Sequence, residues 1–424
     1  MTINLDFVFE SAYDNFIRMN KVLLIICDGL SDRPISELGN KTPLEEANKP
    51  NLDKLVKRGM TGLMHTVDIG IRPGSDVAHL SLFGYDTGQY YTGRGPFEAA
   101  GYGIDLKPGD VALRGNFATV DDNLIIIDRR AGRINDTQEL VNLFSYVNID
   151  GVKIIIKKGT GHRVAVVLRG EDLDGKVSDT DPHVENMKVL ESESLLNSKS
   201  GAKTASIINK FVRLSYKTLK DHAINIKRAE NKLPPANIIL LRGAGKLPSM
   251  PTFAQKYRLK AACIAGAGLY RGIAKILGME VINVPGATGQ LDTDLEAKIK
   301  TALAWLNKYD FMFVHIKGAD ILAEDGNYVG KKQFIEKIDK SFAPLVDKED
   351  ILIVITADHS TSSQLRMHTA DPVPLLIAGK NLHTDSVESF GEREAAGGKL
   401  GHIKGKHLMP MILDFIGKAP LYGA

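Results

Sequence analysis

The sequence contains little cysteine, no long apolar run and almost no net charge. Its two cysteines, Cys27 and Cys263, stand within apolar runs of a 424-residue chain, which excludes a disulfide-stapled scaffold and indicates buried thiols in a reducing compartment. The net charge of +3 is too small to favour nucleic acid as a partner, although it is compatible with a small anionic substrate. No apolar run approaches the roughly 18 residues of a transmembrane helix. We therefore expect a cytoplasmic protein that binds neither membranes nor nucleic acid.

The remaining composition is that of an ordinary globular protein, with 43% hydrophobic and 25% charged residues. The length predicts two or three domains, each with its own core. Residues 1–18 contain Asp6, Glu10 and Asp14, so we do not interpret them as a signal peptide; they are either a small appendage or a start-site artefact. A homo-oligomer is compatible with this sequence.

The stretch from Asp350 to His368 combines a buried strand with a group of polar side chains. Ile351–Ile355 is an unbroken apolar run, typical of a strand buried on both faces of a parallel sheet. It is followed by Asp358 and His359, and then by small hydroxyl residues and His368. Open α/β sheets bind ligands at the carboxyl ends of their strands, and carboxylate with imidazole suits manganese or zinc. The alternative is that the Asp-His pair only caps a loop.

Two segments near the N-terminus add further candidates. Lys21–Cys27 predicts a strand that leads into Asp28, which is either catalytic or a turn residue. Ser75 follows Pro-Gly and precedes an apolar helical pattern, so it lies at a helix N-terminus, where an alkoxide or a phosphate is favoured. The alternative is a simple Ser N-cap. His79, four residues later, is expected to pack beside the site rather than to bind metal.

Residues 106–232 differ in pattern from the segments on either side. Short β-like runs separated by Gly and Asp turns are followed by a long helical stretch, Ala202–Ala229. We predict an inserted α+β cap domain at 106–232, between two parts of a core at 1–105 and 233–424. A cap that closes over an anionic substrate needs arginines, and this segment contains several.

The chain after residue 233 alternates strands and helices again. Three more buried strands are predicted. Asn237–Leu241 is followed by Arg242, Ala261–Ala265 by Arg271, and Phe311–Ile316 by Asp320 and Glu324. With the first and last strands, five buried runs carry charged residues near their carboxyl ends. Together they predict one site at one edge of an α/β sheet.

The glycine-rich segment Gly266–Gly272 follows a predicted strand and opens a predicted helix, as a dinucleotide-binding motif does. Arg271 occupies the third glycine position, and the acidic residue nearest to the required place, Glu280, comes too early. Arg271 is better interpreted as a phosphate clamp.

In combination these motifs resemble the alkaline phosphatase superfamily, and the chain from Met19 onward resembles the archaeal-type cofactor-independent phosphoglycerate mutases. The motifs that carry the resemblance are Asp28-Gly29, Gly74–Leu80, Asp320 with a ligand position four residues later, Asp358–Ser360 and His368–Pro374. The resemblance implies an alkaline-phosphatase-like, mostly parallel sheet with helices on both faces, interrupted by the cap. It also implies interconversion of 2-phosphoglycerate and 3-phosphoglycerate through a phosphoserine, without 2,3-bisphosphoglycerate.

The resemblance assigns residues to two divalent metal ions, with manganese expected and zinc, cobalt or magnesium as alternatives. One ion falls to Asp28, Ser75, Asp358 and His359, and the other to Asp320, Glu324 and His368. The family has His at the position of Glu324, so either both sites fill with an altered preference or the second metal binds weakly. The family's substrate-binding positions are matched loosely by Arg163, Arg242, Arg271, His162 and Asp181.

The chemistry of the residues agrees with this resemblance. A serine hydroxyl is a weak nucleophile at its free pKa, and a bound metal activates it. The nearest alternative is a two-metal phosphomonoesterase or phosphonate hydrolase, because only the exclusion of water by a cap separates a mutase from a hydrolase. A dinucleotide-dependent oxidoreductase and a catalytically inactive binding protein, the latter suggested by Glu324, remain as further alternatives.

Overall fold

The computed structural model describes residues 19–421 and residue 423, which divide into two compact units. Unit 1 comprises the described chain up to Gln89, Pro251–Gly266 and the chain from Leu277 onward; unit 2 comprises Tyr90–Met250 and Ala267–Ile276. Unit 2 therefore has different bounds from the predicted insertion at 106–232. The appendage predicted at residues 1–18 lies outside the described residues.

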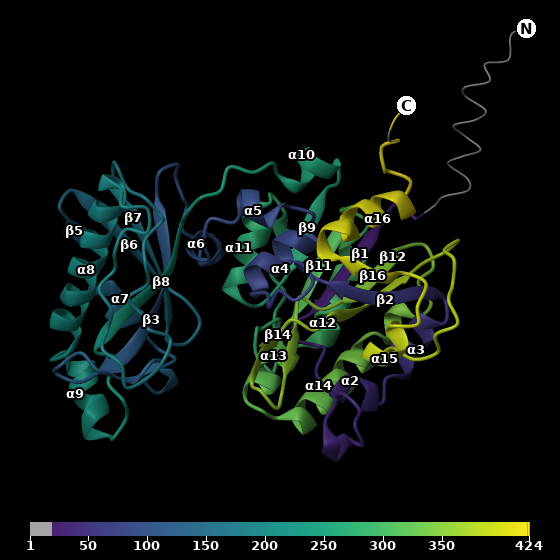
Figure 1. The fold of residues 1–424 in the computed structure, drawn as a ribbon, viewed down its shortest axis with the longest axis horizontal. Helices are drawn as coiled ribbons and strands as arrows, with labels where there is room; N and C mark the ends of the chain where they lie inside the picture. The colour runs from purple at the N-terminus through teal and green to yellow at the C-terminus, as the bar shows by residue number, and fades with distance from the viewer. Residues whose placement is uncertain (1–18, 422, 424) are drawn as a thin grey trace, which may run out of the picture. The chain divides into compact units, whose positions relative to one another are not determined.

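Unit 1 is built, within the described residues, on an eight-stranded sheet with the order β10-β9-β11-β1-β12-β15-β2-β16 (Figure 1). These strands are β1 (Val22–Cys27), β2 (Gly59–His65), β9 (Ala261–Ile264), β10 (Glu280–Val281), β11 (Phe311–Ile316), β12 (Leu352–Thr356), β15 (Val373–Ala378) and β16 (Gly401–Lys404). Neighbouring strands are parallel except that β15 is antiparallel to both β12 and β2. Strands β1, β11 and β12 are buried along their whole length, as strands covered on both faces are. The predicted mostly parallel α/β core is confirmed.

The helices of unit 1 connect these strands and pack against the sheet. They include α2 (Pro43–Glu46), α3 (Pro50–Val56), α4 (Ser75–Leu82), α10 (Phe253–Tyr257), α12 (Leu295–Trp305), α13 (Gly318–Glu324), α14 (Tyr328–Ser341), α15 (Glu392–Ala395) and α16 (Leu408–Phe415), while α5 (Thr87–Tyr90) ends at the first residue of unit 2. Helix α12 packs on β11, and α3 and α15 pack on β2 and β15. Helix α2 ends before Ala47, which is extended, and Lys49 is not helical either, as expected of a residue before proline; α2 and α3 are therefore separate.

Unit 2 contains a six-stranded antiparallel sheet with the order β4-β3-β7-β6-β5, in which β8 also pairs with β3. The strands are β3 (Val111–Val120), β4 (Ile126–Asp128), β5 (Asn148–Ile149), β6 (Val152–Lys158), β7 (Arg163–Arg169) and β8 (Ile238–Lys246). Assignment of Asn237–Leu241 to the central sheet was wrong, since this run belongs to β8 and pairs with Gly115–Ala118 of β3. Strand β8 is packed against α8 and α6. A strand of an antiparallel sheet that is covered by helices has the same continuous apolar pattern as a buried parallel strand.

Five helices of unit 2 lie within the described residues: α6 (Gly95–Gly101), α7 (Gln138–Asn142), α8 (Lys199–Leu219), α9 (Ala223–Glu230) and α11 (Gly268–Ile276). The helix predicted over Ala202–Ala229 is divided between α8 and α9. Helix α8 lies along the six-stranded sheet and buries Phe211 in the core of this unit (Figure 1).

The glycine-rich segment Gly266–Gly272 lies where two helices of unit 2 come together. A Cβ atom on Gly272 of α11 would lie 1.6 Å from the carbonyl oxygen of Phe97, and one on Gly101 of α6 would lie 1.8 Å from that of Gly268. Neither position has room for a side chain. The glycines are therefore required by the close approach of α6 and α11, which accounts for them without a bound dinucleotide.

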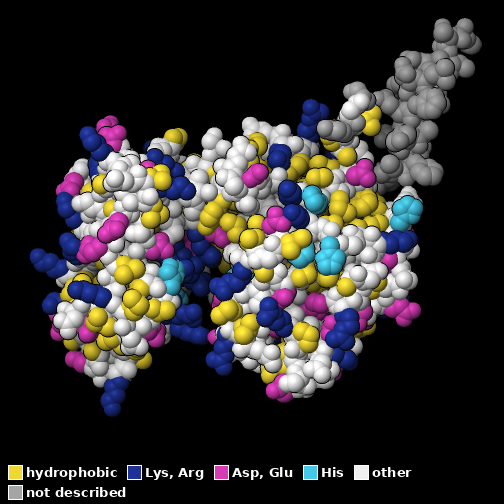
Figure 2. All heavy atoms as spheres, viewed as in Figure 1, with side chains coloured by type: hydrophobic (Ala, Val, Ile, Leu, Met, Phe, Trp, Pro, Cys, Tyr) yellow, Lys and Arg dark blue, Asp and Glu magenta, His cyan; other side chains and the backbone are white. Residues whose placement is uncertain are grey.

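In the described part of the chain, no helix combines the length and the apolar character needed to cross a membrane. Figure 2 shows basic and acidic side chains interspersed over one face of the molecule, in agreement with the small net charge.

Candidate active site

The candidate site lies at the carboxyl ends of three adjacent strands of unit 1. Strands β11, β1 and β12 are neighbours and run parallel, so their carboxyl ends meet at one edge of the sheet. Asp28 follows β1, Asp320 lies in the first turn of α13 after β11, and Asp358 and His359 follow β12. This edge is the place where α/β sheets bind their ligands.

The first donor cluster gathers around one imidazole nitrogen, and it contains the four residues that the resemblance assigns to one metal. His359 Nε2 lies 3.2 Å from Ser75 Oγ, 3.4 Å from Asp28 Oδ1 and 3.3 Å from Asp358 Oδ2. All four side chains are buried. Ser75 is the first residue of α4, so its hydroxyl also lies at a helix N-terminus.

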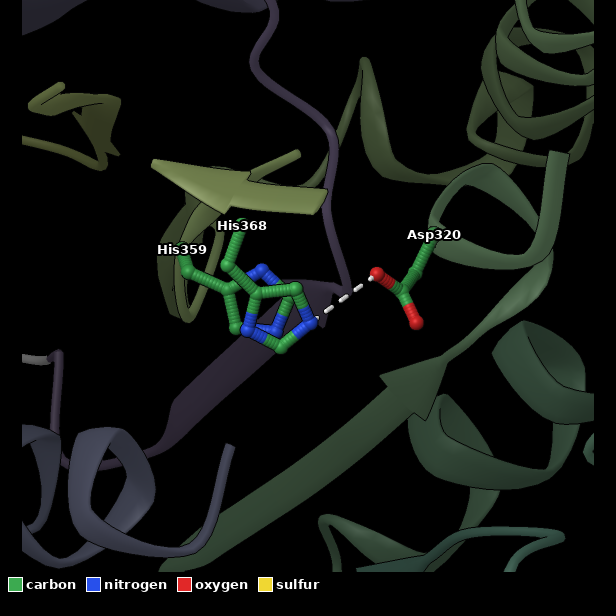
Figure 3. Close-up of side chains that lie close together, drawn as sticks. All are labelled: Asp320, His359 and His368. Carbon is green, nitrogen blue, oxygen red and sulfur yellow. Dashed lines mark ion pairs between the residues drawn. The ribbon is translucent and has the colours of Figure 1, made fainter. Parts of the chain in front are cut away.

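The second donor cluster comprises Asp320, His359 and His368, shown in Figure 3. His368 Nε2 lies 3.6 Å from Asp320 Oδ1, and the rings of His359 and His368 stack with centroids 3.6 Å apart. Glu324 lies at the edge of this cluster, with Oε1 4.0 Å from His368 Nε2 and a side chain that is 50% exposed. The two clusters share His359.

Hydrogen bonds fix which nitrogen of each imidazole faces the clusters. Since the carboxylate of Asp320 only accepts, the Thr361 hydroxyl donates to Asp320 Oδ1 at 3.0 Å and accepts from His359 Nδ1 at 3.0 Å. His368 Nδ1 likewise donates to the carbonyl of Pro73 at 3.0 Å. In both rings the lone pair is therefore on Nε2, which faces the donor clusters, as metal-ligating histidines require.

Burial and mutual repulsion make the carboxylates of this site unusual. Burial and the neighbouring Asp28 charge raise the pKa of Asp358 to about 7. Burial also opposes ionisation of Asp28, but Lys317 and His315 outweigh it and hold the pKa of Asp28 well below its usual range. Burial lowers the pKa of His315 to about 3, so this ring is neutral at pH 7.

Three residues of the site were not predicted from the sequence, namely His315, Lys317 and Thr361. Lys317 Nζ lies 2.9 Å from Asp28 Oδ2 and 2.7 Å from Asp320 Oδ2, so one ammonium group joins the two donor clusters. Lys317 stands one residue after β11. A charged residue near the end of a buried strand is the pattern that indicated the other candidates, and the same pattern could have indicated Lys317. His315 is a residue of β11 itself and not of the segment after the strand. Its role is revealed only by the contact of its Nε2 atom with Asp28 Oδ2 at 3.3 Å.

These residues fit divalent metal ions. Three buried carboxylates and two imidazole lone pairs form the oxygen and nitrogen donor set that manganese and zinc prefer. Asp358 Oδ2 is buried and has no hydrogen-bond partner among the described residues, a partner that a bound cation would supply. The carboxylate and imidazole donor atoms lie within 4.8 Å of one another both in the group Asp28, Asp358 and His359 and in the group Asp320, His359 and His368.

The predicted substrate-binding residues lie in unit 2. The Arg129 guanidinium binds both carboxylate oxygens of Asp181, at 2.9 and 2.6 Å, and Arg242 Nε lies 3.9 Å from the same carboxylate. Arg163 begins β7 next to His162, and burial with the charge of Arg163 lowers the pKa of His162 to about 3. Arg271 lies on α11.

A second arginine cluster of unit 2 was missed in the sequence. Glu98 on α6 is buried, and its Oε1 lies 2.8 Å from Arg94 Nε and 3.1 Å from Arg114 Nη1. In the register of the two strands, Arg114 of β3 lies opposite Arg242 of β8. Burial raises the pKa of Glu98, but Arg114, Arg94 and Arg163 outweigh it, and the resulting pKa is about 2.

Comparison with known proteins gives similarity over nearly the whole chain. A family model described as the metalloenzyme superfamily matches residues 20–415. The 2,3-bisphosphoglycerate-independent phosphoglycerate mutase 1 of Methanocaldococcus jannaschii is 48% identical over 413 residues, which cover 96% of this chain and 100% of that protein. The protein of the same name from Archaeoglobus fulgidus is 47% identical over 410 residues, covering 95% and 100% of the two chains.

Two solved structures are similar as well. A protein from Pyrococcus horikoshii has a TM-score of 0.82 and 36% identity, covering 95% of this chain and 99% of its own. The cofactor-independent phosphoglycerate mutase from Thermoplasma acidophilum has a TM-score of 0.68 and 37% identity, covering 94% of this chain and 100% of its own.

Proposed function

Because the chain belongs to the metalloenzyme superfamily and, within it, to the 2,3-bisphosphoglycerate-independent phosphoglycerate mutases, we propose that it interconverts 2-phosphoglycerate and 3-phosphoglycerate with Ser75 as the phosphoryl carrier. The reaction is an isomerisation of a small phosphorylated acid and uses no 2,3-bisphosphoglycerate. Relatives at 48% identity along their full length support the activity. The geometry around Ser75 supports the assignment of the carrier.

The observation that carries this proposal is the position of the Ser75 hydroxyl. It lies at the N-terminus of α4 and 3.2 Å from His359 Nε2, at a point where carboxylates from two strand ends also meet. A phosphoryl group on Ser75 would be near the N–H groups of the first turn of α4, which favour an anion. Lys317, which joins the two clusters, adds a fixed positive charge near the same place.

The reaction needs two transfers at the same oxygen. Ser75 Oγ attacks phosphorus, the bond from phosphorus to the glycerate oxygen breaks, and the proton lost by the serine is balanced by the one gained by the glycerate hydroxyl. The other hydroxyl of the retained glycerate then attacks the phosphoserine, and Ser75 recovers its proton. His359, held in one tautomer by Thr361, keeps a fixed position beside Oγ through both steps.

We assign two divalent ions to the donor clusters, one to Asp28, Ser75, Asp358 and His359 and the other to Asp320, Glu324 and His368. When bound, such ions lower the pKa of a coordinated hydroxyl and neutralise charge on phosphoryl oxygens. Manganese is the proposed metal, because a carboxylate at position 324 makes the second cluster more anionic and richer in oxygen than a histidine would.

We further propose that unit 2 acts as the cap and supplies the groups that bind the substrate anion. Arg163, Arg242 and Arg271, with His162 and Asp181, are the assigned residues. Burial lowers the pKa of Arg242, and the charge of Arg94 lowers it further, so a bound anion would relieve the repulsion between these two arginines.

The two cysteines are buried thiols, which agrees with a reducing cytoplasm.

One assay tests this proposal against its nearest alternative. The protein is supplied with Mn²⁺ and 3-phosphoglycerate, without 2,3-bisphosphoglycerate, and both 2-phosphoglycerate and inorganic phosphate are followed. A mutase yields 2-phosphoglycerate up to the equilibrium ratio with little released phosphate. Stoichiometric release of phosphate without 2-phosphoglycerate would instead identify a phosphomonoesterase.

A further inference from the structure

Lys331 is a fully buried lysine that takes no part in the proposed chemistry. Its side chain has no exposed surface, and its ammonium group donates three hydrogen bonds: to the carbonyl of Ser31 at 2.9 Å, to Asp32 Oδ2 at 3.0 Å and to the carbonyl of Thr361 at 2.9 Å. Burial of a charge is costly, and a cation near the N-terminus of a helix, here α14, is unfavourable. Helix stability therefore does not explain this lysine.

The partners of Lys331 belong to the two loop segments after β1 and β12 that carry Asp28, Asp358 and His359; the second segment includes the short strand β13 (Ser360–Ser362). Ser31 is three residues after Asp28, and Thr361 is two residues after His359. The carbonyl of Ser31 also accepts from the backbone N–H of Thr361 at 3.0 Å, and Ser31 forms a parallel bridge with Ser360. The ammonium group thus joins two loops at the point where their backbones already meet.

The carboxylate partner extends the same connection. Asp32 accepts from the backbone N–H of Ser363 at 3.0 Å and from its hydroxyl at 2.6 Å. Lys331 itself comes from α14, which packs against α13, the helix of Asp320 and Glu324. One buried ion pair therefore connects the ligand-bearing segments after β1 and β12 with α14, which packs against the ligand-bearing helix α13.

We propose that Lys331, paired with Asp32, is a positioning residue that holds these loops in the geometry required for metal binding. The ligand atoms of the metal centre meet only if the loops after β1 and β12 keep their register. The Thr361 backbone, fixed by Lys331, also places the hydroxyl that orients His359. This inference rests on the proposed function, because it presupposes a metal centre at these clusters.

The test compares the Mn²⁺ affinity of three apoproteins: wild type, Lys331→Met and Lys332→Met. Lys332 is the matched control, since it is the next residue of α14 but forms a partly exposed pair with Glu336. Calorimetric titration should show Mn²⁺ binding 10- to 100-fold weaker in Lys331→Met, the range typical of residues that orient metal ligands, and unchanged within about 2-fold in Lys332→Met. A folded Lys331→Met protein with wild-type affinity would overturn the inference.

A double variant separates positioning from simple loss of stability. Lys331→Met leaves the Asp32 carboxylate buried without its cation, and Asp32→Asn removes that charge. We expect Lys331→Met/Asp32→Asn to recover thermal stability while its Mn²⁺ affinity stays at least 5-fold below wild type. Recovery of both would contradict a positioning role. A wild-type protein that takes up no Mn²⁺ would overturn the proposed metal centre itself, which is a distinct result from equal affinities in all variants.

Discussion

At the scale of single residues, His359 is the point at which the two donor clusters meet. Its Nε2 atom lies within 3.4 Å of Asp28 after β1, of Asp358 after β12 and of Ser75 on α4, and its ring stacks on His368 of the second cluster. Thr361 fixes its tautomer through the other ring nitrogen. A substitution at His359 would therefore disturb both clusters, whereas Ser75 and Glu324 each belong to one.

Replacement of Ser75 tests the phosphoryl carrier. Ser75→Ala should reduce mutase activity below about 1% of wild type and leave the fold intact, because it removes one hydroxyl at the edge of the core. Ser81→Ala, another buried serine of α4, is the control and should keep its activity. Mass spectrometry after a rapid acid quench of the wild type should find phosphate on the peptide containing Ser75. Activity above a few per cent in Ser75→Ala would remove this residue from the mechanism.

Replacement of Glu324 tests whether the half-exposed carboxylate binds metal. The 4.0 Å between Glu324 Oε1 and His368 Nε2 allows both to coordinate one ion. Elemental analysis should give two metal equivalents in the wild type and one in Glu324→Ala, while Asp325→Ala keeps two. Glu324→His should bind Zn²⁺ more tightly relative to Mn²⁺, since imidazole suits zinc. An equal stoichiometry in wild type and Glu324→Ala would show that Glu324 is not a ligand.

Several of the predicted ligands follow strands, which is why the sequence pattern could point to residues that the structure brings together. Asp28 stands directly after β1, Asp358 and His359 stand two and three residues after β12, and Ser75 is the first residue of the buried helix α4. His315 and Thr361 carry no such signal, because their roles depend on contacts across the sheet edge. The spacing of Glu324 indicated a ligand position, but its exposure depends on the packing of α13 and was not predictable.

At the scale of elements, buried strands were predictable but their partners were not. The runs that became β1, β9, β11 and β12 were assigned to the central sheet, and the structure confirms them. The run Asn237–Leu241 looks the same in sequence, yet it pairs with β3. Hydrophobic pattern reports burial, whereas strand pairing depends on contacts between distant residues, here more than a hundred residues apart.

The Glu98 cluster between α6 and β3 makes a prediction on pH dependence. The pKa of Glu98 is lowered from 4.5 to about 2, so its contribution to stability is complete above about pH 4.5 and is lost as the pH falls towards 2. Glu98→Gln should lower the stability of unit 2 by about 3 kcal/mol at pH 6, as removal of one partner of a buried ion pair does. Hydrogen exchange of β3, compared between wild type and variant at each pH, should show this difference shrinking below pH 4. Glu139→Gln, at an exposed glutamate of α7, is the control; a difference that persists unchanged at pH 2 would contradict the assignment.

At the scale of the whole molecule, metal ions should couple activity to stability. Without cations, three buried carboxylates, Asp28, Asp320 and Asp358, lie close together, and Lys317 donates hydrogen bonds to two of them. Treatment with EDTA should therefore abolish activity and lower the melting temperature, and Mn²⁺, Co²⁺ or Zn²⁺ should restore both. An ion present at 100 times its dissociation constant stabilises the folded state by about 2.7 kcal/mol per site. EDTA saturated with Mn²⁺ is the control and should have no effect, and full activity in protein shown to be metal-free by elemental analysis would refute the metal centre.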